Sequence, residues 1–304
     1  MKTNIFFMGS SEYSLLILKN LAKQFSIKLV ATQPDKPVGR DKNIRPSLIK
    51  VIADELNIPV IQPKKLNDEQ FWKTLQAYDI DLIVVAAYGK ILLKKLLEYP
   101  RFGCINVHAS LLPRWRGASP IQAAILNGDR QTGVTILKMD EGIDTGPILS
   151  KRAIDIDARE TSETLALMLS KIGSKLLSDT LPGYLEGKIQ PQPQSDHGAT
   201  YAGLIKKEDG LLDFNQPAEY LEKKIRAYNP WPICFMGWGK DFLRVYKAEV
   251  SNEKHFDQFQ RGIKNKYPCV GTSTNDIILI EVQPSGKKRI DGKSFLNGAR
   301  NWEK

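Results

Sequence analysis

The chain is 304 residues long and 42% hydrophobic, which is enough for one large domain or two smaller ones with a sizeable core. No apolar run approaches the length of a membrane-spanning helix, and residues 5–8 are too short for the core of a signal peptide, so we expect no membrane partner. The net charge of +10, from 44 Lys+Arg against 34 Asp+Glu, favours a polyanionic partner such as nucleic acid, although a solvated lysine-rich surface would give the same balance.

The few cysteines and histidines narrow the chemistry further. The three cysteines lie far apart and form no Cys-x-x-Cys pair, which indicates a reducing setting. The three histidines show no metal-ligand spacing, so we expect no metal ion. We expect the protein to act as a monomer in the cytoplasm.

Strand and helix patterns alternate through the first part of the chain. Apolar, β-rich runs predict strands at 4–8, 28–32, 81–87, 104–108, 133–139 and 147–151, the last two as a hairpin. Apolar residues at helical spacing predict helices at 15–21, 47–57, 90–98, 120–127 and 165–177. The run at 81–87 is continuously apolar, as in a strand buried on both faces of a parallel sheet. This alternation predicts an α/β fold with a doubly wound, mostly parallel sheet.

The composition changes near residues 187–200, where a polar stretch with prolines is typical of a semi-extended linker. Beyond it we predict a helix at 217–228, strands at 233–238, 242–250, 267–270 and 277–282, and a helix at 294–300. Short strands at this spacing indicate a small β-barrel. We therefore divide the chain into a first domain at 1–188, a linker at 189–206 and a smaller second domain at 207–304.

Asn106, His108 and Asp144 are the candidate catalytic residues. Asn106 and His108 end the strand at 104–108, and because residues i and i+2 of a strand point to the same face, we expect their side chains to project together. With Asp144 they would supply an amide, an imidazole and a carboxylate, which can polarise a carbonyl, stabilise an oxyanion and manage a proton. The other interpretation is structural, because such a histidine often only packs and an Asp before Thr-Gly often only closes a turn.

Two further observations point to the same place. Residues 110–117 form an irregular stretch inside otherwise regular α/β sequence, and long loops of this kind often carry function. His108 and Tyr88-Gly89 both lie just past the carboxyl ends of strands, where ligands bind in open α/β sheets. Gly9-Ser10-Ser11 does not complete the G-x-G-x-x-G pattern, so we expect no NAD.

Residues 33–50 form a basic segment that prolines and a glycine should keep irregular. Its candidate nucleic-acid contacts are Lys36, Arg40, Lys42 and Arg45. A mobile basic loop beside the active site is one interpretation, and an exposed connector with ordinary charges is the other.

A second set of basic residues could also contact nucleic acid. Arg114 and Arg116 flank Trp115 close to His108, and a cationic, stacking surface suits single-stranded nucleotides. Trp115 could instead simply pack on the loop. Lys206 and Lys207 begin the second domain and are candidate phosphate contacts, although charged runs are usually only solvated.

Six motifs are spread over the whole chain: Thr32-Gln-Pro-Asp-Lys-Pro-Val-Gly-Arg40, Ala87-Tyr-Gly89, Asn106-Val-His108, Ser110-Leu-Leu-Pro-Arg-Trp-Arg-Gly117, Asp144-Thr-Gly146 and Arg226-Ala-Tyr-Asn-Pro-Trp-Pro232. In these motifs the chain resembles the methionyl-tRNA formyltransferase family. Asn-x-His with Ser-Leu-Leu-Pro is shared by 10-formyltetrahydrofolate-dependent formyltransferases in general. A tRNA acceptor is therefore indicated by residues 33–50, by Pro-Arg-Trp-Arg-Gly and by the second domain.

The resemblance implies a Rossmann-like catalytic domain followed by an OB-fold-like tRNA-binding domain. It implies transfer of a formyl group from the co-substrate 10-formyltetrahydrofolate to the α-amine of methionyl initiator tRNA, for translation initiation. By the same analogy Asn106, His108 and Asp144 are catalytic. The folate-contacting residues that it implies are Ser110, Leu111, Leu112, Pro113, Ala87, Tyr88 and Gly89, although the two leucines could equally be core. The tRNA-contacting residues would be Lys36, Arg40, Lys42, Arg45, Arg114, Arg116, Lys206 and Lys207.

Three other functions stay open at this point. A formyltransferase acting on a nucleotide sugar or on glycinamide ribonucleotide would share the catalytic residues but would have no use for a basic loop. A hydrolase would release formate from the same donor without any acceptor. A non-catalytic RNA-binding protein would not need the Asn-x-His…Asp set.

Overall fold

The structure is a computed structural model that describes residues 3–38, 43–299 and 301–303, without the side chains of 36–38 and 43–45. It contains two compact units, which we describe separately. The first comprises Met1–Pro120, Gln131–Asp155 and Ala166–Ala202, and the second comprises Ile121–Arg130, Ile156–Leu165 and Gly203–Lys304.

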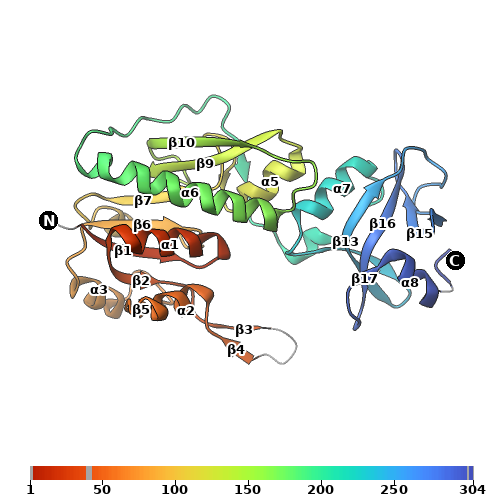
Figure 1. The fold of residues 1–304 in the computed structure, drawn as a ribbon, viewed down its shortest axis with the longest axis horizontal. Helices are drawn as coiled ribbons and strands as arrows, with labels where there is room; N and C mark the ends of the chain where they lie inside the picture. Colours follow the sequence, from red (N-terminus) through yellow and green to blue (C-terminus); the bar gives the residue numbers. More distant parts are fainter. Residues whose placement is uncertain (1–2, 39–42, 300, 304) are drawn as a thin grey trace. The chain divides into compact units, whose positions relative to one another are not determined.

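A seven-stranded sheet forms the core of the first unit (Figure 1). Its strand order is β10-β9-β7-β6-β1-β2-β5, with β1 at Asn4–Gly9, β2 at Ser26–Ala31, β5 at Val60–Ile61, β6 at Leu82–Ala86, β7 at Cys104–His108, β9 at Gln131–Lys138 and β10 at Ile148–Asp155. The strands from β7 to β5 are parallel, and the β9–β10 hairpin adds two antiparallel strands beside β7. All five residues of β6 are buried. The predicted doubly wound, mostly parallel sheet is confirmed.

The helices of the first part of the chain are α1 at Glu12–Gln24, α2 at Leu48–Glu55, α3 at Glu69–Gln76, α4 at Lys94–Leu97, α5 at Pro120–Asn127 and α6 at Ser162–Leu185. Figure 1 shows α1 and α6 side by side on one face of the sheet, where the Ser170 hydroxyl donates to the Tyr13 carbonyl at 2.6 Å. Gly173 lets α6 approach the sheet closely, because a Cβ there would lie 3.0 Å from Val107 Cγ1 on β7.

Two helices differ from the sequence prediction. The helix expected at 90–98 is only the single turn α4, since Leu93 is extended (ψ 152°) and Pro100 limits the other end. The prediction missed α3, a short helix that Asp68 caps by accepting a hydrogen bond from the Phe71 amide at 2.7 Å.

Residues 33–50 also differ from the prediction. They contain a β-hairpin of β3, Lys36–Val38, and β4, Asn43–Arg45, so the expectation that prolines keep this segment irregular is wrong. A two-stranded ribbon tolerates Pro37 because an edge strand can leave one backbone position unpaired. Arg40 and Lys42 lie outside the described residues, as do the side chains of Lys36 and Arg45.

The segment before residue 203 is hydrogen-bonded to other parts of the first unit. Gln192 exchanges backbone hydrogen bonds with Ile148 at 2.7 and 2.8 Å. Strand β11, Tyr201–Ala202, then pairs in parallel with β8, Arg116–Gly117. These residues are therefore built onto the first unit, next to the loop that follows β7.

An antiparallel sheet forms the second unit, with strand order β12-β13-β16-β15-β14 and β17 paired to β16. The strands are β12 at Cys234–Trp238, β13 at Asp241–Val250, β14 at Arg261–Lys264, β15 at Tyr267–Gly271, β16 at Asp276–Pro284 and β17 at Ile290–Asp291. Helix α7, Ala218–Ala227, packs on β13 and β16, and α8, Gly292–Gly298, packs on β15 and β16. This unit is the expected small OB-fold-like domain.

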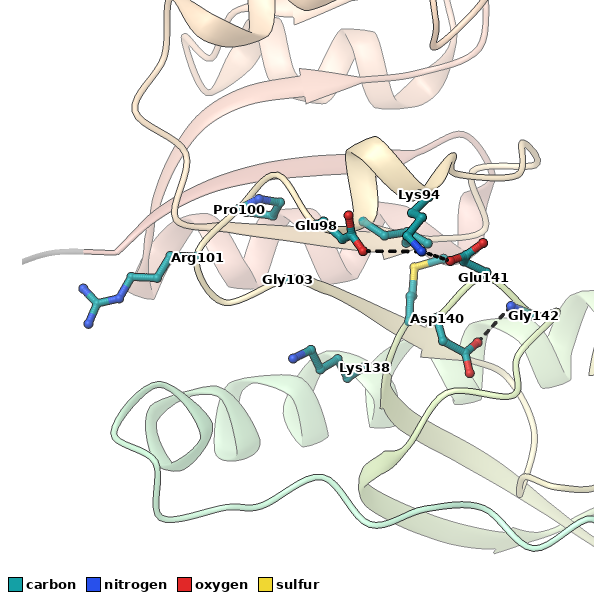
Figure 2. A pocket seen from close by; sticks show the side chains of 11 residues that line it. Lys94, Glu98, Pro100, Arg101, Gly103, Lys138, Asp140, Glu141 and Gly142 are labelled. Atoms are coloured by element: carbon teal, nitrogen blue, oxygen red, sulfur yellow. Dashed lines mark hydrogen bonds and ion pairs between the residues drawn. The ribbon is translucent and has the colours of Figure 1, made fainter.

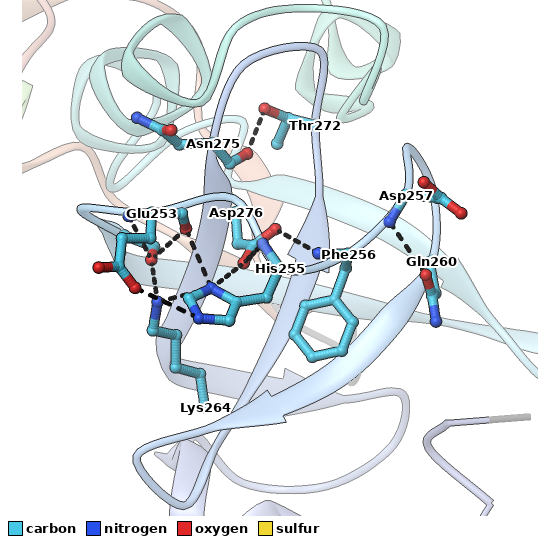
Figure 3. A network of polar contacts seen from close by, with 10 residues as sticks. Glu253, His255, Phe256, Asp257, Gln260, Lys264, Thr272, Asn275 and Asp276 are labelled. Carbon is cyan, nitrogen blue, oxygen red and sulfur yellow. Dashed lines mark hydrogen bonds and ion pairs between the residues drawn. The ribbon is translucent and has the colours of Figure 1, made fainter.

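A polar network fastens the loop between β13 and β14 of this unit (Figure 3). The fully buried Asp276 carboxylate accepts hydrogen bonds from the backbone amides of His255 at 2.9 Å and Phe256 at 3.2 Å. Lys264 Nζ lies 2.6 Å from Ser251 Oγ and 3.0 Å from His255 Nδ1. A buried carboxylate that satisfies two backbone donors explains why the loop can cross the sheet without regular structure.

Candidate functional site

The structure brings Asn106, His108 and Asp144 together around one carboxylate. Asn106 and His108 lie at the carboxyl end of β7, on the same face of the strand. Asp144 Oδ1 accepts a hydrogen bond from Asn106 Nδ2 at 3.1 Å, and Asp144 Oδ2 lies 3.5 Å from His108 Nδ1. The predicted convergence of the amide, the imidazole and the carboxylate is therefore present in the fold.

Asp144 reaches this position because the loop between β9 and β10 is tightly built. Asp140 Oδ1 accepts hydrogen bonds from the Gly142 amide at 3.1 Å and from Thr145 Oγ1 at 2.7 Å. Asp144 itself has φ 53°, a left-handed conformation that Asp tolerates better than most residues. At Gly146 a Cβ would lie 1.9 Å from the Lys138 carbonyl oxygen, so only glycine fits the return of the loop.

His108 is buried, with 5% of its surface exposed, and both of its ring nitrogens face acceptors. Nε2 lies 2.9 Å from the Trp115 carbonyl oxygen, and Nδ1 faces the Asp144 carboxylate. A carbonyl can only accept, so Nε2 carries a proton, and the ring can donate through both nitrogens only as an imidazolium. The Asp144 side chain is 14% exposed and Asn106 is half-buried, so these two form the more open side of the site.

The loop after β7 is fixed by hydrogen bonds inside the first unit. Thr135 Oγ1 on β9 donates to the Ser110 carbonyl at 2.7 Å and accepts from the Leu112 amide at 3.1 Å. The Ser110 hydroxyl donates to the Arg114 carbonyl at 2.6 Å, and the Leu112–Pro113 peptide bond is cis. The loop is therefore part of the rigid scaffold around His108.

The predicted folate-contacting residues of this loop differ in burial. Ser110 is fully buried and Leu112 is 1% exposed, so both side chains pack inside the loop. Leu111 and Pro113 are half-buried, which leaves them accessible to a ligand.

The Ala87-Tyr88-Gly89 turn after β6 also contains both exposed and buried residues. Ala87 (φ 46°) and Gly89 (φ 78°) are exposed, whereas the Tyr88 side chain is 1% exposed and packs in the core. Burial raises the pKa of Tyr88 to about 12. The Tyr88 carbonyl accepts hydrogen bonds from Ser10 Oγ at 3.2 Å and Gln33 Nε2 at 3.0 Å, which fixes the turn. Any contact of Tyr88 with a ligand would therefore come from its backbone and not from its ring.

The two arginines beside His108 differ in their exposure to solvent. The Arg114 guanidinium lies 4.5 Å from the centre of the Trp115 ring, and both side chains are half-buried. Arg116 is 2% exposed, and its guanidinium is hydrogen-bonded within the first unit. The structure therefore does not present the Arg116 guanidinium to a phosphate, and its predicted contact with tRNA stays a prediction. Lys206 and Lys207, in the second unit, are both exposed.

A cavity of about 610 Å³ lies elsewhere on the first unit (Figure 2). It opens beside Gly103, which precedes β7, and Lys138, which ends β9, and is thus at the opposite end of β7 from His108. Lys94 Nζ lies 2.9 Å from Glu141 and 3.9 Å from Glu98 at its rim, and the hydrogen bond to Glu141 raises the pKa of Lys94. None of the sequence-predicted site residues lines this cavity, so we do not assign it to the substrate.

In the part of the chain that the structure describes, no three His, Cys, Asp or Glu side chains are grouped as metal ligands. No helix among the described residues has the length and apolar character needed to span a bilayer.

Two contacts that hold Asp144 in place, from Gly117 and Gln194, were not predicted from the sequence. Oδ2 of Asp144 accepts a hydrogen bond from the Gly117 amide at 2.8 Å, and Gln194 Nε2 donates to the Asp144 carbonyl at 2.8 Å. The proline-rich context of Gln194 carries no signal of this contact, since polar residues in such a segment usually face solvent.

Comparisons with known proteins agree along the whole chain. Residues 1–181 match the family model described as formyl transferase, and residues 204–300 match that of the formyl transferase C-terminal domain. The methionyl-tRNA formyltransferase of Pseudoalteromonas translucida (strain TAC 125) is 40% identical over 304 residues, covering 98% of this chain and 94% of the relative. That of Bacillus pumilus (strain SAFR-032) is 43% identical over 300 residues, covering 97% of this chain and 94% of the relative.

Solved structures share the fold at lower identity. WlaRD, a sugar 3N-formyl transferase solved in the presence of dTDP and 5-N-formyl-THF, is similar with a TM-score of 0.67 and 19% identity, covering 95% of this chain and all of its own. This likeness extends to the architecture alone and does not distinguish one formyl acceptor from another.

We predict that Gly146→Ala inactivates the protein without unfolding it. The new methyl group would lie 1.9 Å from the Lys138 carbonyl, so the loop must shift and carry Asp144 away from Asn106 and His108. A displacement of about 1 Å can cost roughly 100-fold in rate. Turnover should fall by about that factor, measured by formyl transfer beside a thermal unfolding curve.

Gly237→Ala is the matched control, since a Cβ at Gly237 meets nothing within 4 Å. Near-normal turnover in Gly146→Ala would mean that the position of this loop does not govern activity.

Proposed function

The chain belongs to the methionyl-tRNA formyltransferase family, and from this premise we propose that it transfers a formyl group from 10-formyltetrahydrofolate to the α-amine of methionyl initiator tRNA, with Asn106, His108 and Asp144 as its catalytic residues. Identity near 40% along almost the whole chain supports the reaction. The observation that carries the residue assignment is the single Asp144 carboxylate that contacts both Asn106 and His108. The formylated product serves translation initiation.

The reaction needs a neutral amine. Free α-amines have a pKa of about 7.7–8.0, and the ester link to tRNA lowers that value, so a useful neutral fraction exists at neutral pH. The amine nitrogen attacks the formyl carbon, which forms a C–N bond and moves the carbonyl electron pair onto oxygen. The tetrahedral intermediate then collapses, the bond from carbon to the folate nitrogen breaks, and a proton from the amine offsets the one that the folate nitrogen gains. The acceptor supplies its own nucleophile, so no side chain has to form a covalent intermediate.

Asn106 and His108 stabilise the developing oxyanion in this proposal. The Asn106 amide has two N–H groups, of which Asp144 accepts one, so the second can point to the substrate oxygen. Both ring nitrogens of His108 already face acceptors, so in this proposal its Nε2–H leaves the Trp115 carbonyl to donate to the substrate, and His108 then acts as general acid toward the leaving nitrogen. Loss of one such donor typically costs about 2.7–4 kcal/mol, or roughly 100- to 1000-fold in rate.

Asp144 has two tasks in the same proposal. Its carboxylate orients Asn106 and His108 together, and it accepts the proton that leaves the attacking amine. The Gly117 amide, at 2.8 Å, keeps the carboxylate in place while both contacts form. Because these tasks concern the transition state, we expect removal of the carboxylate to affect turnover more than binding of the formyl donor.

We place the binding surfaces at residues that are exposed or half-buried. The backbone of Ala87 and Gly89, with the half-buried Leu111 and Pro113, is our proposed wall for the flat pterin ring. Arg114 and Trp115 offer a cation and a ring next to His108 for the unpaired end of the tRNA. Lys206, Lys207 and residues 33–50 are the proposed phosphate contacts.

We also propose that the protein works as a monomer in the cytoplasm. The three cysteines are free and buried, as suits a protein that uses no disulfide bonds. All of the proposed catalytic residues come from one chain, so the chemistry needs no second copy.

The acceptor is tested by one parallel assay with a radiolabelled formyl donor. Charged initiator tRNA, charged elongator methionine tRNA, a nucleotide amino sugar and glycinamide ribonucleotide are offered separately, and one reaction contains no acceptor. Label should enter charged initiator tRNA well above all others. Preferred labelling of a small acceptor, or release of formate without any acceptor, would replace the proposed function with one of the alternatives.

The role of Asp144 is tested by Asp144→Asn. The amide keeps the shape but loses the charge and the second acceptor, so kcat should fall by roughly 100- to 1000-fold while affinity for the formyl donor changes little. Glu141→Gln, an exposed carboxylate on the same loop, is the matched control and should stay active. Normal turnover of Asp144→Asn at saturating substrate would remove Asp144 from the mechanism.

A further inference from the structure

Arg116 is a buried cation that contacts a half-buried neutral amide and an exposed carboxylate. Its Nε and Nη2 atoms donate to Gln194 Oε1 at 3.2 and 3.1 Å. Its Nη1 atom donates to Asp196 Oδ1 at 2.9 Å and to the Tyr201 hydroxyl at 3.4 Å. The Asp196 side chain is 90% exposed, so this ion pair is weakened by solvent. A buried guanidinium is tolerated only where hydrogen bonds satisfy its N–H groups, and Gln194 accepts two of them.

Gln194 connects that cation to the loop of Asp144. Its Nε2 atom donates to the Asp144 carbonyl at 2.8 Å and to the Gly146 carbonyl at 2.6 Å. The amide oxygen accepts two N–H groups from Arg116, and the amide nitrogen donates both of its own, so every hydrogen-bonding position is used. A flipped amide would turn its NH₂ group toward the guanidinium and its oxygen toward two carbonyls. Arg116 therefore fixes the orientation in which Gln194 can hold the loop.

The same short stretch holds Asp144 from two sides. Gly117, the next residue after Arg116, donates its amide to the Asp144 carboxylate, while Arg116 acts through Gln194 on the Asp144 backbone. Strand β11 pins this stretch, because Tyr201 pairs with Arg116 and the Ala118 amide donates to the Ala202 carbonyl at 2.9 Å. At Gly117 a Cβ would lie 2.5 Å from that Ala202 carbonyl oxygen, so the two strands are in close contact.

We propose that Arg116 and Gln194 are positioning residues for formyl transfer, which act by holding Asp144 in its left-handed conformation against Asn106 and His108. The inference rests on the proposed function, because it presupposes that Asp144 takes part in the reaction. It assigns residues 194–202, which the sequence presents as a linker, to the construction of the active site. Gln194 itself touches no reacting atom.

The test uses the full-length enzyme, charged initiator tRNA and the formyl donor. Gln194→Ala removes the whole bridge, whereas Gln194→Glu keeps an oxygen for Arg116 but can no longer donate to the two carbonyls. Both variants should lower kcat by roughly 10- to 100-fold, as expected for a misplaced catalytic group. KM for both substrates should stay within about threefold, because the lost interaction concerns the transition state. Gln192→Ala, two residues earlier and with an exposed side chain, is the matched control and should keep normal turnover.

A second readout separates positioning from general structural support. If Gln194 acts through Asp144, then Gln194→Glu added to Asp144→Asn should cause little further loss of kcat. If the two losses multiply, or if kcat and the thermal midpoint fall while KM rises in both Gln194 variants, the residue is only structural and the inference is wrong. A normal kcat in Gln194→Glu beside an inactive Asp144→Asn would likewise overturn it.

The catalytic role of Asp144 and the positioning role of Gln194 fail separately. An active Asp144→Asn would defeat the proposed catalytic role of Asp144, whatever Gln194 does. Should Gln194→Ala prove unstable, Arg116→Lys gives an independent measurement, because an ammonium keeps the charge but cannot donate the fixed fork of N–H groups to the Gln194 oxygen. It should show the same split, with kcat reduced and KM unchanged, and a normal kcat would contradict the inference.

Discussion

The two oxygens of the Asp144 carboxylate organise this site. One accepts the Asn106 amide, and the other faces the His108 imidazole while it accepts the Gly117 amide. These groups come from β7, from the loop after it and from the loop between β9 and β10. All three segments must therefore be correctly placed before the hydrogen bonds to the carboxylate can form. A carboxylate with this little solvent contact is stable only when such partners are in place. The chemistry that we propose depends on the same arrangement.

The rest of the first unit holds those three segments in position. Strand β7 is held between β6 and β9, and α6 presses on it closely where Gly173 meets Val107. Thr135 on β9 ties down the loop after β7 through Ser110 and Leu112. Functional side chains thus project from a rigid sheet edge and from loops that hydrogen bonds fix on both sides. Packing and hydrogen bonds of this kind orient groups for a carbonyl reaction.

How far the sequence could predict this structure depended on the range of the interactions. Strand β7 and the shared face of Asn106 and His108 follow from local periodicity, and both were predicted correctly. The long contacts were not predictable. Arg116 looked like a free tRNA-binding cation because its partners, Gln194 and Asp196, lie 78 and 80 residues further along the chain. The burial of the Ser110, Leu112 and Tyr88 side chains could not be predicted from the sequence for the same reason. The hairpin of β3 and β4 was not predicted, because proline is disfavoured in most strands but is tolerated in an edge strand.

His108 and Asp144 must act as one unit if the shared carboxylate governs catalysis. A double-mutant cycle tests this most directly, with single-turnover formyl transfer measured for His108→Gln, Asp144→Ala and the double variant at saturating formyl donor. Residues that work as a unit give strongly non-additive losses, so the double variant should be about as slow as the slower single variant. Rate losses that simply multiply would show that the two side chains act independently, and would contradict the central role of one shared carboxylate.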